Sequence, residues 1–334
     1  MNCKTYLALP HVIAFTRWLA TELESTVLFK HEYVNRKTGV QWSCSSLYNA
    51  FEHYRWNHPG NSRLDFASGT SALSNGVALA ALRKDLLAAT GDDSRSAEAA
   101  SDVMRWGGVT AHNVDWLQTN KAGLAGMLQS VVAALDAGDE RAALLRSDNL
   151  RFNAGMTKVY SLLCKDFIIY DSRVAAGLGW LVVKYCHAHG LVKVPPALCF
   201  PWANAKEDKD ALAPKRRNPG SDGFKFTGLR SGRHHAMWNL RASWLLTAVL
   251  KHPSAAGSRF QQVAAPNDPL RAMEAALFMI GYDLGQEAEV PDLEYSAEFA
   301  EKILAASRGN FVEVSADDLI AQLDDMLAKA RVSG

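Results

Sequence analysis

Apolar residues recur at every third or fourth position along most of the chain, which is the spacing of one face of an α-helix. The pattern predicts helices at residues 73–89, 122–137, 157–164, 172–189, 237–250, 270–284, 297–307 and 316–330. Asp115 and Ser172 are suited to cap helix starts, and Gly138, Gly190 and Gly285 follow expected helix ends. A mainly α fold with few short strands follows.

Strand-like alternation is confined chiefly to residues 32–42, where residues 36–39 predict a turn. Residues 42–66 are rich in aromatic side chains, and residues 195–233 combine prolines, glycines and charges, which predicts irregular structure. We therefore expect four regions: an aromatic-rich N-terminal segment packed on the core (1–70), a helical region (71–190), a basic irregular insertion (191–235) and a C-terminal helical region (236–334).

Length and composition predict a folded globular protein, because 334 residues with 48% hydrophobic and 21% charged side chains can build one elaborate core or two packed ones. No apolar run reaches the roughly 20 residues that span a bilayer, and the N-terminus lacks the pattern of a signal peptide. The 5 cysteines are scattered without a CxxC pair, which predicts free thiols. We expect a cytoplasmic monomer without membrane partner, metal or cofactor.

Charge is unevenly distributed, although the net charge is only +1. The basic residues between 211 and 241, set against the single acid Asp222, are Lys215, Arg216, Arg217, Lys225, Arg230, Arg233 and Arg241. Acidic residues dominate from Asp283 to the C-terminus. Such asymmetry fits a surface that faces a polyanion. An equal alternative is a solvated loop whose charges only maintain solubility.

An amine and a carboxylate stand at two adjacent helix starts. Lys158 opens the segment 157–164, and Asp171 precedes the segment 172–189 after the short run Phe167–Tyr170. Such a pair can form a covalent catalyst for cleaving a C–N bond to a sugar. A lysine with the ordinary pKa of about 10.4 is almost wholly protonated, so catalysis needs burial or a helix dipole to disfavour the cation. The alternative is a helix cap at Asp171, worth about 1 kcal/mol, beside a surface lysine.

The residues around Lys158 and Asp171 favour the catalytic interpretation over a helix cap beside a surface lysine. Gly-Met-Thr-Lys-Val at residues 155–159, the apolar run ending at Tyr170, and Asp-Ser-Arg-Val-Ala at 171–175 resemble the hairpin region of helix-hairpin-helix DNA glycosylases. The resemblance is to the bacterial 8-oxoguanine-glycosylase-like family in particular, and it covers residues 100–190. The usual hairpin has two glycines separated by one residue, whereas this chain has only Gly155, one position out of register, with Met156 in the place of the second.

The resemblance implies a two-lobed helical glycosylase fold that excises a damaged or modified base from double-stranded DNA. Lys158 would attack C1′ of the sugar, displace the base and form a Schiff base, with strand nicking by β-elimination as a further step. Asp171 would stabilise the positive charge that develops on the sugar. Backbone N–H groups at Gly155 and Thr157 would bind a phosphate. Family members are associated with DNA repair and with defence against phages that carry modified bases.

Further contacts to DNA follow from charge and from base flipping. The residues expected to reach the DNA backbone are Arg173, Lys215, Arg216, Arg217, Arg230, Arg233 and His234. A flipped base needs a pocket. Trp106, Asn113, Trp116 and the aromatic cluster at residues 42–66 are candidates for it, although tryptophans and tyrosines at helical spacing more often pack in a core. The glycines after Trp106 improve its candidacy, because paired glycines let a backbone approach a ligand.

Three other classes of protein remain as alternatives. The first is a non-catalytic DNA-binding defence protein that keeps the fold. The second is a glycosylase without lyase activity, in which Asp171 activates water and Lys158 only contacts DNA. The third, an α-helical nuclease, is disfavoured because the chain shows no clustered carboxylates suited to Mg²⁺. No local motif names the base, so 8-oxoguanine and a decorated cytosine fit the sequence equally well.

Overall fold

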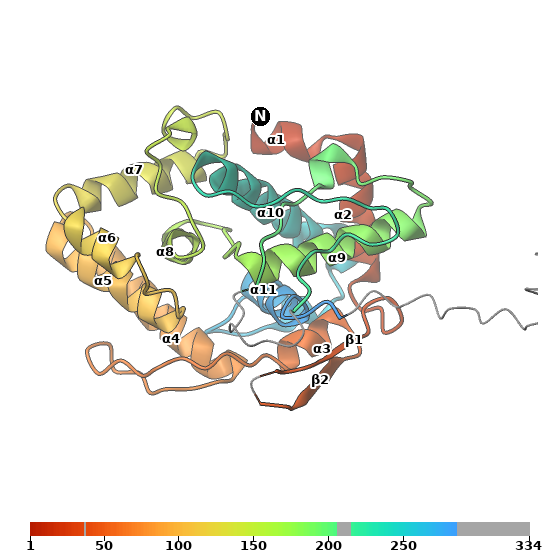
Figure 1. Cartoon of the computed structure of the whole chain (residues 1–334), viewed down its shortest axis with the longest axis horizontal. Helices are drawn as coiled ribbons and strands as arrows, with labels where there is room; N and C mark the ends of the chain where they lie inside the picture. Colours follow the sequence, from red (N-terminus) through yellow and green to blue (C-terminus); the bar gives the residue numbers. More distant parts are fainter. Residues whose placement is uncertain (37, 206–214, 286–334) are drawn as a thin grey trace, which may run out of the picture. The chain divides into compact units, whose positions relative to one another are not determined.

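A computed structural model describes residues 1–36, 38–205 and 215–285, so the helices expected at 297–307 and 316–330 lie outside the described residues. In the described residues the α-helices are α1 (Cys3–Leu7), α2 (Pro10–Glu22), α3 (Leu47–Glu52), α4 (Ala72–Ala88), α5 (Asp93–Trp106), α6 (Val114–Thr119), α7 (Leu124–Asp136), α8 (Met156–Leu163), α9 (Ser172–Ala188), α10 (Arg233–Lys251) and α11 (Pro269–Ile280). The 3₁₀ turns are η1 (Leu144–Arg146), η2 (Pro196–Leu198), η3 (Pro253–Ala255) and η4 (Arg259–Gln262). The prediction of a mainly α fold is confirmed (Figure 1).

A single antiparallel pair of strands is present in the described part of the chain. Strand β1 (His31–Val34) pairs with β2 (Gln41–Cys44), with Val34 opposite Gln41. This is the hairpin expected around residues 32–42. Tyr33 and Trp42 lie opposite each other and their rings stack at a centroid distance of 4.8 Å, which stabilises the pair.

The six predicted helices that fall on described residues are present, with ends shifted by a few residues. Helix α11 ends at Ile280, and Gly281 lies against helix α9, where an added Cβ would stand 1.9 Å from the carbonyl oxygen of Arg173. Helices α1, α2, α3, α5 and α6 were not predicted. Helix α5 buries mainly alanines and small polar residues such as Ser101, so it has few strongly apolar side chains.

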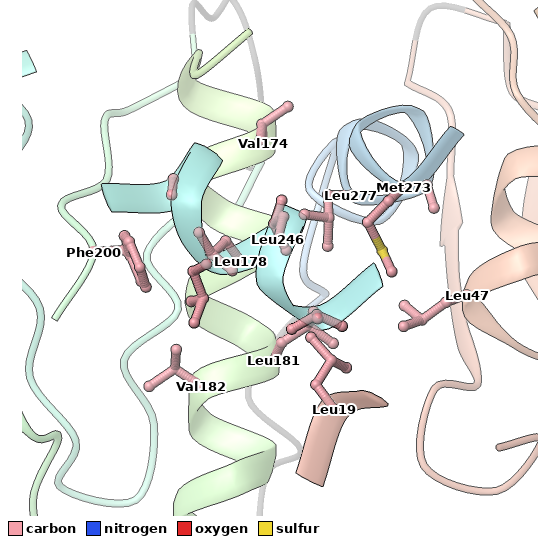
Figure 2. Close-up of a cluster of buried hydrophobic side chains, with 14 of the residues drawn as sticks. Leu19, Leu47, Val174, Leu178, Leu181, Val182, Phe200, Leu246, Met273 and Leu277 are labelled. Carbon is pink, nitrogen blue, oxygen red and sulfur yellow. The ribbon is translucent and has the colours of Figure 1, made fainter. Parts of the chain in front are cut away.

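Two hydrophobic clusters of buried side chains make up the core of residues 1–285. The α9 cluster combines helices α1–α3 with α9, α10 and α11, and Figure 2 shows Leu178 and Leu181 of α9 gathered with Leu246 of α10 and Leu277 of α11. The α8 cluster combines α4–α8, and in Figure 1 helix α8 is seen end-on beside them. Helix α10 contributes side chains to both clusters, including Leu240 to the α8 cluster.

The extended segment Phe167–Tyr170 runs between these clusters. Its side chains alternate, as they must in an extended chain. Phe167 and Ile169 belong to the α8 cluster, while Ile168 and Tyr170 belong to the α9 cluster. Asp171 follows directly, at the start of α9. The segment therefore places the end of α8 and the start of α9 at the boundary between two cores.

No helix among the described residues is long and apolar enough to cross a bilayer. All five cysteines are free, as predicted, and three of them are buried: Cys44, Cys164 and Cys186.

Candidate active site

The structure brings the two predicted catalytic side chains together. Lys158 Nζ lies 3.3 Å from Asp171 Oδ2 and donates a second hydrogen bond, of 3.0 Å, to the carbonyl oxygen of Ala154. Lys158 is only 5% exposed. The alternative of a surface lysine is therefore wrong, and the two side chains form a largely buried ion pair.

Asp171 is at the same time the cap of helix α9. Its Oδ1 accepts the N–H groups of Arg173 and Val174 at 3.0 and 3.2 Å, so Asp171, and not Ser172, caps the helix. Burial acts to raise the pKa of the Asp171 carboxyl, but the Lys158 charge, the Val174 N–H and the nearby Arg173 outweigh it and lower the pKa. The carboxylate is therefore ionised at neutral pH.

Side chains, and not a sheet, satisfy the backbone of the extended segment before Asp171. Every hydrogen bond in this group joins a buried N–H or C=O to a side chain of another helix: Ile168 N to Ser243, Ile168 O to Asn239, Ile169 N to Glu274, Tyr170 N to Thr157 and Tyr170 O to His235. Because an unpaired buried backbone group is costly, these five side chains hold the segment in one conformation.

The contacts of Thr157 and His235 tie the two helix starts together. Thr157 Oγ1 donates to Asn239 Oδ1 at 2.5 Å and accepts the N–H of Tyr170 at 3.0 Å. His235 Nε2 lies 2.6 Å from the Tyr170 carbonyl, which can only accept, so this nitrogen carries the proton. Burial lowers the pKa of His235 to about 4. A neutral histidine and a buried threonine thus fix Lys158 relative to Asp171.

A glycine makes room for the Lys158 side chain. A Cβ on Gly107 would lie 2.5 Å from Lys158 Cδ and 2.7 Å from its Cε, so the lysine stem passes over this backbone. The paired glycines after Trp106 suggested a close approach to a ligand. The structure shows that Gly107 accommodates the lysine itself, while Gly108 has a positive φ of 62°.

The ion pair lines a narrow cavity with aromatic walls. The cavity measures about 40 Å³. Besides Lys158 and Asp171, its aromatic and polar lining consists of Phe51, Tyr54, Trp56, Trp106, Phe278, Asn75, Asn267, Arg271 and Glu274. A buried polar network orients two walls, because Trp56 Nε1 donates to the Trp106 carbonyl and Trp106 Nε1 donates to Asn75 Oδ1.

A second ion pair, Arg271–Glu274, stands in the same cavity. Glu274 Oε2 accepts both the Arg271 guanidinium and the Ile169 N–H, the latter at 2.6 Å. Burial raises the pKa of the Glu274 carboxyl despite the opposing charge of Arg271. Sequence analysis did not identify this pair, because nothing near residue 274 marks it as part of a site.

Of the predicted pocket residues, Trp106 lines the cavity, as do Phe51, Tyr54 and Trp56 of the aromatic cluster at residues 42–66. Asn113 and Trp116 do not. Asn113 Oδ1 accepts hydrogen bonds from Arg151 and Asn153, and the Arg151 guanidinium stacks 5.0 Å from the centre of the Trp116 ring. These two residues therefore support the loop before α8 and do not face the ion pair.

The start of α8 is closed off by its own cap. Asn153 Oδ1 accepts the N–H groups of Gly155 and Met156, both at 2.9 Å. Gly155 is buried, and Thr157 is 0% exposed with its hydroxyl bonded on both sides. The phosphate contact expected from Gly155 and Thr157 is not available in this arrangement, because their donors already have internal partners.

Several basic residues predicted to face DNA are instead turned inward. The guanidinium of Arg173 lies 4.3 Å from the ring centre of Phe278 and 4.8 Å from that of Tyr282, and burial lowers its pKa. Arg217 is 8% exposed and donates to the Ser172 hydroxyl. Arg216 bonds the carbonyl oxygens of residues 218 and 220, and Lys215 lies 5.6 Å from the Tyr282 ring.

Arg230 and Arg233 remain at the surface. Arg230 is exposed, and the Arg233 side chain is 65% exposed with Asp148 at 3.6 Å. His234 is half-buried, accepts the N–H of Arg230, and has its pKa lowered by burial. The positive surface in the described residues of this stretch is therefore smaller than the sequence suggested.

No protein-family model, curated protein or solved structure matches this chain. Among described residues, no group of three His, Cys, Asp or Glu side chains is placed to bind a metal. The cavity combines an amine that can become a nucleophile, an ionised carboxylate that can stabilise a cation, and flat aromatic walls.

Proposed function

We propose that the protein is a DNA glycosylase that excises a damaged or modified base, with Lys158 as nucleophile and Asp171 as electrostatic stabiliser. The observation that carries the proposal is the Lys158–Asp171 pair, 3.3 Å apart in the wall of a cavity with aromatic sides. The resemblance of residues 155–175 to the hairpin region of helix-hairpin-helix glycosylases supports the same roles. Action in repair or in defence against phages with modified DNA is compatible with this chemistry.

In the proposed reaction the Lys158 amine first loses a proton to solvent. Its lone pair then forms a bond to C1′ while the C1′–N bond breaks, and the base leaves with the bonding electrons and takes a proton from water. The negative charge of Asp171 offsets the positive charge that develops on the sugar. Opening of the sugar ring gives a Schiff base, from which β-elimination can cleave the strand.

Access of a base to the cavity requires movement of its walls, because about 40 Å³ holds no more than a few water molecules. Trp56 and Phe278 are half-buried and stand in that wall, in edge-to-face contact with each other at 5.5 Å. Displacement of these rings would widen the cavity and leave flat surfaces on which a flipped base can stack.

Base release is the direct test. Wild-type protein and Asp171→Asn are incubated with unmodified duplex, 8-oxoguanine duplex and phage DNA with modified cytosines, and borohydride is added to trap a Schiff base. We expect one base to be released, an adduct to be trapped, and Asp171→Asn to lower the rate about 10²–10³-fold. Asparagine still caps a helix, and Lys158 can release its proton once its carboxylate is lost, so the variant should remain folded.

Asp92→Asn is the matched control, since Asp92 caps helix α5 in the same way, through the N–H of Arg95 at 2.9 Å, outside the cavity. It should leave base release unchanged. No release from any DNA, with salt-sensitive binding intact, would replace the proposal by a non-catalytic DNA-binding protein. Release without a trapped adduct would leave Asp171 as the activator of water and remove the nucleophilic role of Lys158.

A further inference from the structure

The α11 side of the cavity carries two polar atoms without a partner in the described part of the chain. Glu274 uses only Oε2 for the Ile169 N–H and the Arg271 guanidinium, and no hydrogen bond reaches its Oε1. The Tyr54 hydroxyl likewise has no hydrogen-bond partner there, and both residues line the cavity. These atoms offer one acceptor and one donor to whatever enters.

Both side chains are almost completely buried, since Glu274 is 6% exposed and Tyr54 is 8% exposed. Burial, followed by the charge of Glu274, raises the pKa of Tyr54, so its phenol stays neutral and its hydroxyl can donate or accept. Burial also raises the pKa of Glu274, but the Arg271 guanidinium and the Ile169 N–H on its Oε2 favour the ionised form, whose free oxygen can only accept.

A flat ring between the aromatic walls would meet this pair edge-on. The matching edge has an N–H that donates to Glu274 beside a ring nitrogen that accepts from Tyr54. Cytosine and adenine have this edge, with the amino group outside the ring and the acceptor within it. In uracil and hypoxanthine the two are exchanged, so a carbonyl oxygen would face the carboxylate without a proton between them, which is costly in a buried site.

We propose that Glu274 and Tyr54 read the pairing edge of the flipped base, and that the substrates are bases with an amino group beside a ring nitrogen, namely cytosine, adenine and their modified forms. This inference rests on the proposed base release at Lys158 and Asp171. Because that pair holds C1′ in one place, the base cannot slide to exchange donor and acceptor positions. Both residues act on recognition and leave the bond-breaking step to the α8–α9 side.

The test compares bases that differ only by deamination. Duplexes carry 5-hydroxymethylcytosine or 5-hydroxymethyluracil, and adenine or hypoxanthine, at one position. Single-turnover release is measured, and binding is measured separately with 2′-fluoro nucleotides, whose glycosidic bond resists cleavage. The wild type should prefer the amino member of at least one pair by about 10²-fold. Glu274→Gln should lower that ratio at least about tenfold, since a carboxamide can donate to a carbonyl.

Glu140→Gln is the matched control, because Glu140 is a comparably buried carboxylate paired with Arg241 away from the cavity. It should leave the ratio unchanged. An unchanged ratio in folded Glu274→Gln, with release intact, overturns the recognition role and leaves the glycosylase standing. If Glu274→Gln does not fold, the wild type decides, since equal release and equal binding of the amino and the carbonyl member in both pairs overturns the recognition role.

The two proposals fail in different ways. Absence of release together with a binding ratio that depends on Glu274 overturns base excision but keeps recognition of the amino edge. Absence of both release and any binding preference overturns both.

Discussion

Two carboxylates line one cavity, and their surroundings move their pKa values in opposite directions. Asp171 has its pKa lowered, whereas Glu274 has its pKa raised. Both are desolvated by burial. Asp171 receives two backbone N–H groups at a helix start and a lysine ammonium, while Glu274 receives one N–H and one guanidinium. The charges and N–H groups that reach Asp171 outweigh burial, whereas those that reach Glu274 do not, and the charge of Asp171 adds to the rise in the Glu274 pKa.

The difference assigns separate tasks to the two sides of the cavity. The α8–α9 side has an ionised carboxylate next to an amine, which suits charge stabilisation and nucleophilic attack. The α11 side has a carboxylate tied into the backbone of the segment before Asp171, with one oxygen left for a ligand. Substitutions on the α8–α9 side should therefore mainly lower the rate of base release, whereas substitutions on the α11 side should mainly lower the free energy of unfolding.

The largest effect is expected from loss of the amine. Lys158→Gln should lower base release roughly 10⁴-fold and abolish the borohydride-trapped adduct, because no other residue that lines the cavity is a lysine. Single-turnover kinetics with trapping measure both. Lys165→Gln, an exposed lysine just after α8, serves as control. Retained base release in Lys158→Gln would show that Lys158, and with it the α8–α9 side of the cavity, does not carry the bond-breaking step.

Loss of the opposite carboxylate should act on stability. Glu274→Ala leaves the Arg271 guanidinium without its carboxylate and Ile169 N–H without its acceptor, which should cost about 3–5 kcal/mol. Asp171→Asn should cost less, because asparagine still caps α9 and Lys158, unlike a guanidinium, can release its proton when its carboxylate is lost. Urea unfolding of the two variants measures this contrast. Equal losses would mean that the two carboxylates share one structural role.

The pH dependence of stability tests the hydrogen bond from neutral His235 to the carbonyl oxygen of Tyr170. His235 has a pKa of about 4 in the folded protein, against an ordinary value of 6.5, so the unfolded chain alone takes up the proton between these values. Stability from this group is complete above pH 6.5 and is lost as pH falls toward 4. The difference of 2.5 corresponds to about 3 kcal/mol.

Unfolding free energies at pH 4.5 and 7 check this expectation. His235→Gln retains a donor for the Tyr170 carbonyl and should show a shallower slope than the wild type. His11→Gln, at an exposed position of α2, should not change the slope. The same slope in all three proteins would contradict a neutral, buried His235.

The smallest effect is expected at the glycine beneath the lysine. Gly107→Ala would place a Cβ 2.5 Å from Lys158 Cδ, so the flexible stem must move and the amine leaves its position beside Asp171. We expect about tenfold slower base release with little change in thermal stability. Gly126→Ala on helix α7, where nothing lies within 4 Å of the added Cβ, should keep the rate and slightly raise stability. Equal rates in both would show that Lys158 tolerates the shift.

Local sequence signals sufficed for six of the described α-helices and for the approach of Lys158 to Asp171. Lys158 and Asp171 were identifiable because both stand at helix starts within a short string, and the helical spacing around them is regular. Helix α5 escaped prediction, since alanines and serines make up most of its buried residues and few of its side chains are strongly apolar. The contact between Lys158 and Asp171, in contrast, joins residues of one continuous stretch.

The residues on the α11 side of the cavity could not be predicted from the sequence, because their contacts join positions that are far apart in the chain. Glu274 bonds the backbone of Ile169 across 105 positions, and Asn239 bonds Ile168 across 71. The prediction that Arg173 and Arg217 face DNA did not anticipate their inward position for a related reason. A run of positive charge does not reveal which guanidinium groups turn inward toward rings or hydroxyls.

The segment Phe167–Tyr170 has a consequence for how the protein unfolds. Its side chains are divided between two hydrophobic clusters, and helices from both clusters supply its hydrogen-bond partners. Neither cluster can melt without exposing the segment and the other. The two halves should therefore behave as one cooperative unit, and the amides of Ile168, Ile169 and Tyr170 should exchange with deuterium only through global opening. The candidate site would then be among the last parts of the molecule to lose its structure.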